Sequence, residues 1–97
     1  MTRPGAARQL SGRVRPSPRI AWQVVGGEAI VLDVTTGLAV GLNEVGTFIW
    51  KNLETLDREQ LVENIVREFA VDRATAKGDL ETFLDRFVRE GVLQEIP

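Results

Sequence analysis

Short apolar stretches separated by turn residues follow one another between residues 20 and 42 of the chain. In the first stretch Ile20, Trp22 and Val24 occupy alternate positions, which places them on one face of a β-strand. Gly26-Gly27 follows, and two glycines that can both adopt positive φ are typical of a tight hairpin turn. Residues 29–34 are nearly all apolar and predict the second strand.

A second turn leads into a third strand. Thr35-Thr36-Gly37 has its glycine at the position where such a turn most often requires positive φ. Beyond it, residues 38–42 alternate again, with leucine or valine at one set of positions and the small residues Ala39 and Gly41 at the other. The pattern therefore predicts a three-stranded antiparallel meander.

After this third strand the spacing of apolar residues lengthens from two to about 3.6, the period of an α-helix. Asn43 is a suitable N-cap for a first helix, Asp57 with Gln60 makes a capping box for a second, and Asp72 caps a third. Gly91 can end the third helix in the left-handed conformation. The apolar faces comprise Val45, Phe48, Ile49 and Leu53; then Leu61, Val62, Ile65, Val66 and Phe69; then Ala76, Leu80, Phe83, Leu84, Phe87 and Val88.

Three strands followed by three helices predict an α+β fold. The last two helices are joined by a short turn around Val71, as in a helix-turn-helix, so the domain is expected to be winged helix-turn-helix-like. The final stretch, residues 92–96, either pairs as a short strand or only packs. We expect the folded domain to span residues 18–97.

The start of the chain has a different composition. Five of the twelve basic residues lie within residues 1–19, which contain no acid, whereas residues 20–97 carry all fourteen acids. Prolines and glycines interrupt this segment, and it contains no apolar run long enough for a signal peptide or a membrane span. We expect residues 1–17 to form a disordered basic tail, although transit peptides and nucleic-acid-binding arms share this composition.

The side chains that most enzymes depend on are missing. The sequence contains no His, Cys or Tyr, which removes the usual general base, the thiol nucleophile and most zinc ligands. Two carboxylate pairs at helical spacing, Glu59 with Glu63 and Glu81 with Asp85, have the geometry to bridge a cation, but such pairs are typical of a solvated helix face. The sequence predicts no catalytic residue, no metal site and no cofactor.

A winged helix-turn-helix commonly binds DNA, which requires a basic surface. Residues 73–90 carry four basic and four acidic side chains, and residues 58–69 carry two arginines against three glutamates. Only the basic tail favours a nucleic acid. DNA binding, or another protein interaction, is therefore the alternative function.

The third strand lies at the edge of the predicted meander and carries neither charge nor proline, the features that usually protect an edge. One explanation is structural, namely that a helix covers the edge or that Gly41 marks a bulge. The functional explanation is that the edge accepts an extended peptide as a fourth strand. The small residues Ala39 and Gly41 leave room for such a peptide.

Residues 28–93 resemble the PqqD-like proteins, the peptide-recognition modules of pathways that make ribosomally synthesised, post-translationally modified peptides. The likeness lies in the order and spacing of several short motifs. These motifs are Leu32, Asp33, Thr36 and Gly37; Leu42-Asn43-x-x-Gly46-x-x-Ile49-Trp50; Val71-Asp72; and Leu84-x-x-Phe87-x-x-x-Gly91-Val92-Leu93.

The resemblance implies a non-catalytic cytoplasmic module, not bound to a membrane, that binds the leader segment of a precursor peptide by strand addition. It also implies a separate maturation enzyme as partner: a radical-SAM enzyme, a leader peptidase or a cyclase. In this family the leader lies beside the third strand and against the third helix. Carried onto this sequence, the peptide-binding residues are Leu38, Ala39, Val40, Gly41, Leu42, Asp79, Phe83 and Arg86.

Other positions are assigned to packing or depart from the family pattern. Leu80, Leu84 and Phe87 are expected in the core, and so are Gly46 and Trp50. The third strand lacks the large aromatic residue that many relatives carry before the Leu-Asn step, which implies a wider or shallower pocket. The segment before the second strand does not closely follow members dedicated to pyrroloquinoline quinone synthesis, so that pathway is not assigned.

Overall fold

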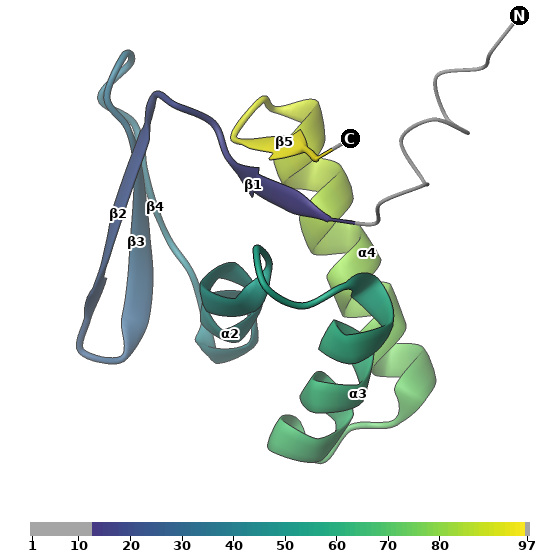
Figure 1. Ribbon diagram of the computed structural model, residues 1–97. Helices are drawn as coiled ribbons and strands as arrows, with labels where there is room; N and C mark the ends of the chain where they lie inside the picture. The colour runs from purple at the N-terminus through teal and green to yellow at the C-terminus, as the bar shows by residue number, and fades with distance from the viewer. Residues whose placement is uncertain (1–12, 97) are drawn as a thin grey trace, which may run out of the picture.

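The computed structural model describes residues 13–96 of the chain. In this part of the chain four short strands come first, three helices follow, and a fifth short strand ends the fold (Figure 1). The elements are β1 (Val14–Pro16), β2 (Ile20–Val25), β3 (Glu28–Asp33), β4 (Ala39–Gly41), α2 (Glu44–Asn52), α3 (Arg58–Phe69), α4 (Arg73–Arg89) and β5 (Leu93–Glu95).

Strands β2, β3 and β4 form one antiparallel sheet in the order β2-β3-β4. Gly26 and Gly27 adopt φ of 59° and 84° in the first turn, and Gly37 adopts 79° in the second. Only glycine takes these values without a steric cost, so the turn chemistry fixes both hairpins. The predicted α+β class and three-stranded meander are confirmed, with β4 shorter than the five residues expected.

A second sheet, which the sequence did not predict, joins the two ends of the described chain. Strand β1 pairs antiparallel with β5, with Val14 opposite Glu95 and Pro16 opposite Leu93. The Ser17 hydroxyl is buried and donates to the Gly91 carbonyl at 2.6 Å. The Ile96 amide also donates to the Arg13 carbonyl. Residues 13–17 therefore belong to the folded domain, and the predicted boundary between residues 17 and 18 is wrong for them. The rest of the expected tail, residues 1–12, lies outside the described residues.

The three helices begin where the capping residues indicate. The Asn43 side chain accepts from the Gly46 amide at 2.8 Å, and the Asp72 side chain accepts from the Thr75 amide at 2.7 Å. Asp57 and Gln60 exchange both bonds of a capping box at the start of α3. These bonds satisfy amides that have no partner within the helix, so the helix starts are set locally.

Helix α2 packs between the sheet and α3, and α3 packs against α4 (Figure 1). Trp50 of α2 contacts Trp22 of β2 and Phe87 of α4 edge to face, with ring centroids 6.1 and 6.3 Å apart. Leu80, Leu84 and Phe87 are buried, as the sequence predicts. The core thus joins one face of the sheet to the helices, and it leaves one side of β4 open beside α4.

Candidate functional site

The hydrogen-bond pattern of β4 determines which backbone groups are available at the sheet edge. The Leu38 carbonyl accepts from the Asp33 amide at 2.9 Å, and the Leu42 amide donates to the Ala29 carbonyl at 2.8 Å. Pairing in an antiparallel ladder alternates along the strand. The backbone N–H and C=O groups of Val40 therefore also point to β3, whereas those of Ala39 and Gly41 point to the open edge.

A groove of about 390 Å³ lies between β4 and α4. Apolar side chains form much of its wall, and polar side chains come from the exposed side of α4. Its lining residues are Val40, Gly41, Leu42, Asn43, Val45, Gly46, Ile49, Asp79, Thr82, Phe83, Arg86 and Phe87. Six of the eight residues expected to bind peptide meet here: Val40, Gly41, Leu42, Asp79, Phe83 and Arg86.

The remaining two expected residues, Leu38 and Ala39, lie outside this groove. Leu38 is 72% exposed and lines a second space of about 230 Å³, which we call the Leu38-end hollow. Val40 and Phe87 line both spaces, so the hollow continues the groove along β4 and α4. Ala39 is paired with Leu32, and its side chain lies with that of Leu32 on the face of the sheet opposite to Val40. Ala39 thus contributes backbone groups alone.

Phe83 forms the apolar wall on the α4 side of the groove. Its ring packs edge to face on Phe87, with centroids 4.8 Å apart. A Cβ at Gly46 would lie 3.3 Å from Asn43 Oδ1 and 3.4 Å from this ring, so the glycine in α2 leaves room for both the capping side chain and the Phe83 ring. These contacts are a physical reason for glycine at a position that the sequence alone assigned only to packing.

Charged side chains flank the apolar wall. Arg86 is about half exposed, and its Nε lies 3.5 Å from Oε2 of Glu90. Its Cζ also lies 5.0 Å from the centroid of the Phe87 ring, within the range of a cation–π contact. Asp79 is exposed about two helical turns before Arg86 on α4. The groove therefore combines an apolar floor with one acidic and one basic group at its rim.

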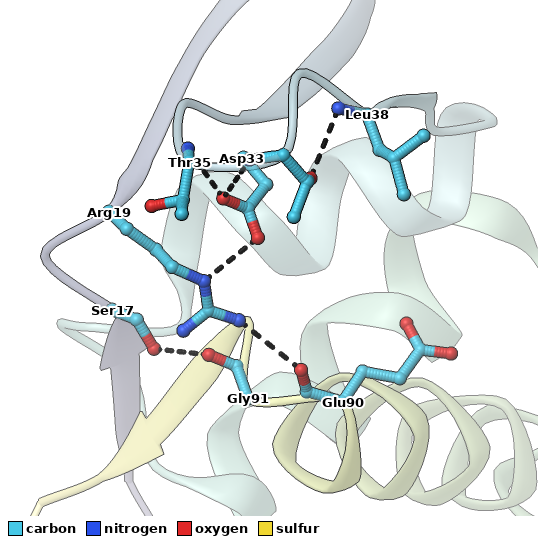
Figure 2. Close-up of polar contacts among 8 residues, drawn as sticks. Ser17, Arg19, Asp33, Thr35, Leu38, Glu90 and Gly91 are labelled. Atoms are coloured by element: carbon cyan, nitrogen blue, oxygen red, sulfur yellow. Dashed lines mark hydrogen bonds and ion pairs between the residues drawn. The ribbon is translucent and has the colours of Figure 1, made fainter.

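The Leu38-end hollow is bordered by a polar cluster that sequence reasoning missed (Figure 2). Arg19 Nε donates to Asp33 Oδ2 at 2.8 Å, while Asp33 Oδ1 accepts from the amides of Thr35 and Thr36. The hydrogen bond from Arg19 is the largest cause that lowers the pKa of Asp33 below its ordinary value. The sequence signal was hidden, because Arg19 reads as one more arginine of the basic start.

One carboxylate of each pair considered as a cation ligand has an arginine partner. Glu59 pairs with Arg73, and Asp85 pairs with Arg89 on the surface of α4. Over residues 13–96 no group of three or more acidic side chains is arranged to hold a metal ion. Among the described helices none is long and apolar enough to cross a membrane.

The chain belongs to the PqqD family. The family model described as coenzyme PQQ synthesis protein D matches residues 28–93. This match confirms the resemblance seen in the sequence. A comparison with curated proteins finds no match.

Two solved structures are similar to this chain over most of its length. TbiB1 in complex with the TbiA(beta) leader peptide is 31% identical, with a TM-score of 0.76, and the match covers 86% of this chain and 98% of that chain. Lasso peptide synthetase B1 complexed with the leader peptide is 18% identical, with a TM-score of 0.76, and the match covers 84% and 98%. At 18% identity the second likeness shows the fold alone.

Proposed function

We propose that this protein binds the leader segment of a ribosomally synthesised precursor peptide and presents it to a separate maturation enzyme. The observation that carries the proposal is the open β4 edge beside the groove. TbiB1, which is 31% identical over nearly its whole length, has been solved as a complex with a leader peptide.

The leader would add to the sheet as a strand beside β4, about 4.8 Å away. The outward backbone groups of Ala39 and Gly41 would bond with it whatever its side chains are. Residues of the leader opposite Val40 and Leu42 would then point to the same side of the sheet as those two side chains, into the groove. Backbone bonds would supply affinity, and the groove walls would select side chains.

Selection in the groove would depend on apolar size and on charge. Phe83 and Val40 offer an apolar surface, with the buried Phe87 behind them, which favours leaders with apolar residues at alternate positions. Arg86 and Asp79 at the rim favour a leader with an opposite charge near each of them. Among the side-chain contacts, burial of the apolar residues would contribute more to the binding free energy than the rim charges, since rim charges are screened by solvent.

The protein itself would act without catalysis, as a non-catalytic partner of a radical-SAM enzyme, a leader peptidase or a cyclase in the cytoplasm. A bound leader would keep its remaining segment free for that enzyme, because only a short stretch fits beside the three residues of β4. Binding in this manner needs no general base or metal, and the groove side chains are suited to recognition.

The test is a titration of the ¹⁵N-labelled protein with the leader half of a precursor encoded beside its gene, and in parallel with the TbiA(beta) leader. We expect saturable shifts of the backbone amide signals of Ala39 and Gly41 and of the α4 residues from Asp79 to Arg86. A scrambled leader and a duplex DNA serve as controls. Shifts confined to β2, or shifts with duplex DNA in place of the leader, would contradict the proposal.

A further inference from the structure

One arginine connects the sheet to the end of α4 at the Leu38-end hollow (Figure 2). Arg19 precedes β2, and its Nε bonds to Asp33 at the end of β3. Its Nη2 donates to the carbonyl of Glu90, the C-cap of α4, at 3.3 Å. The guanidinium thus spans two layers of the fold at the position where the groove ends.

The local environment favours this arrangement. The last carbonyls of a helix carry a partial negative charge, which a cation stabilises. Gly91 has φ of 78°, and a Cβ there would lie 3.1 Å from Arg19 Nη2. Glycine at this position therefore both permits the helix to end and leaves room for the guanidinium.

Asp33 extends the connection to the turn that leads into β4. Its Oδ1 accepts from the Thr35 amide at 2.9 Å and from the Thr36 amide at 3.3 Å, and the Thr36 hydroxyl accepts from the Leu38 amide at 3.2 Å. A chain of polar contacts therefore runs from the Glu90 carbonyl through Arg19 and Asp33 to Leu38. These residues also line the Leu38-end hollow.

We propose that Arg19 is a positioning residue for peptide binding. Together with Asp33 it sets the separation of β4 and α4 at the Leu38 end, and this separation limits the size of the peptide side chain that the hollow accepts. The inference rests on the proposed function, since it assigns a specificity role within the same groove. Arg19 acts through Asp33 and the Glu90 carbonyl and does not need to touch the peptide.

The first experiment compares Arg19→Gln, Asp33→Asn and the double variant with the unaltered protein. Asparagine keeps an oxygen that can accept from Thr35 and Thr36, so this variant preserves the turn and removes the charge that faces Arg19. Each single change should weaken leader binding about fivefold, less than the full contribution of one charge-assisted hydrogen bond, because Arg19 acts on the peptide indirectly. The double variant should bind no more weakly than the singles, because both break the same connection.

Arg73→Gln is the matched control. It breaks an exposed arginine–carboxylate pair with Glu59 that joins α3 to α4, and Arg73 lines neither the groove nor the Leu38-end hollow. Leader affinity should not change in this variant. Melting temperatures are recorded for all four variants, and Asp33→Asn keeps the test informative if Arg19→Gln does not fold.

A second readout separates positioning from general stabilisation. The leader residue in the Leu38-end hollow is identified by nuclear Overhauser contacts to the Leu38 methyl groups, and a peptide with alanine at that residue is prepared. Arg19→Gln should weaken the original peptide about fivefold and leave the affinity of the trimmed peptide nearly unchanged, as expected for coupled neighbours. Equal weakening of both peptides, or of neither, would overturn the positioning role.

The outcomes for the two proposals differ. If the unaltered protein binds neither the leader encoded beside its gene nor the TbiA(beta) leader, the proposed function fails and this inference fails with it. If the unaltered protein binds and Arg19→Gln binds equally well, only the positioning role of Arg19 is lost.

Discussion

The sheet has two outer strands, β2 and β4, and each presents an edge without a partner strand within residues 13–96. Just before β2 the Arg19 carbonyl accepts from the Val34 amide at 3.0 Å. By the same alternation as in β4, Ile20, Trp22 and Val24 turn their backbone groups outward. Strand β2 is also longer than β4, six residues against three. By length and apolar content, β2 is the better template for pairing.

The difference lies in what stands beside each edge. The edge of β4 faces α4 across the groove, so an added strand would contact Phe83 and Arg86. The hollow near β2, about 240 Å³, is lined by residues of β2 and β3 alone. Backbone groups attract any extended chain, and only a side-chain wall distinguishes one sequence from another. We therefore expect the selectivity for a peptide sequence to depend on the neighbouring helix more than on the strand.

Proline substitution at the two edges should give the largest contrast. Ala39→Pro removes a donor that points away from β3, a position where an edge strand tolerates proline, so the fold should persist. We expect leader binding to weaken about tenfold or more, through the lost bond and the misfit of its neighbours. Val24→Pro makes the matched change on β2 and should leave affinity unaltered. Isothermal titration calorimetry of both variants with the leader measures the two affinities. Equal losses of affinity would mean that the leader does not bind preferentially at the β4 edge.

Removing the helix wall should have the next largest effect. Phe83→Ala should weaken leader binding about fivefold and lower the free energy of unfolding by about 2 kcal/mol, since the half-buried ring loses its contact with Phe87. Phe69→Ala is the control, because Phe69 makes an edge-to-face contact with Phe48 at 5.7 Å and does not line the groove. It should destabilise the protein similarly, as urea unfolding would measure, without changing affinity. A parallel loss of affinity in both variants would assign the effect to stability.

The rim charge should matter less than the apolar wall. Arg86→Glu reverses one exposed charge of the groove, and it should weaken leaders with acidic residues about threefold at low ionic strength. The melting temperature should change little, because exposed ion pairs such as that with Glu90 contribute little to stability. Affinities measured at two salt concentrations test this. An effect that persists at high salt would point to direct packing of Arg86 on the leader.

The smallest expected effect is on the pH dependence of the unfolding free energy under acidic conditions. The hydrogen bond from Arg19 lowers the pKa of Asp33, and the hydrogen bond from the Thr75 amide lowers that of Asp72. A lowered folded-state pKa gives stability that is present above the unfolded value of about 3.9 and is lost as pH falls through the folded-state value. Unfolding free energies measured across this window should lose a small part of their pH dependence in Asp33→Asn and in Asp72→Asn.

Leader affinity should separate these two carboxylates. Asp33 borders the Leu38-end hollow, whereas Asp72 caps α4 and lines neither binding space. Protonation of Asp33 removes the same charge as Asp33→Asn and should weaken binding by no more than that variant does, and Asp72→Asn should leave the pH dependence of affinity as it is. The same acid-induced loss of affinity in Asp33→Asn as in the unaltered protein would exclude a role for this carboxylate.

The features predicted from the sequence are those that depend on near neighbours. Turn glycines and capping side chains act within a few residues, so the ends of β2, β3 and the helices could be located. Turn and cap positions use local sequence alone and need no knowledge of distant contacts. The groove residues of α4 needed more: the resemblance to the PqqD-like proteins implied that the third helix faces the peptide, and the stripe of Leu80 and Leu84 then indicated Asp79, Phe83 and Arg86.

The unpredicted features depend on contacts between distant residues. Val14 is the only large apolar residue among arginines and prolines between residues 13 and 19, so it produces no periodic signal for β1. Arg19 meets Asp33 only because of the β2–β3 register, and it meets Glu90 only because α4 ends beside that sheet. Neither contact leaves a mark in the spacing of residues.

The pairing of β1 with β5 has a consequence for engineering. The Ile96 amide bonds to the Arg13 carbonyl at 2.9 Å, so the entry and exit of the fold are neighbours, built from elements that line neither the groove nor the Leu38-end hollow. Domains whose two ends are adjacent suit circular permutation and insertion into the surface loops of other proteins. We therefore expect that residues 13–96 can be inserted as a unit into a surface loop of a host enzyme with the β4 edge left exposed.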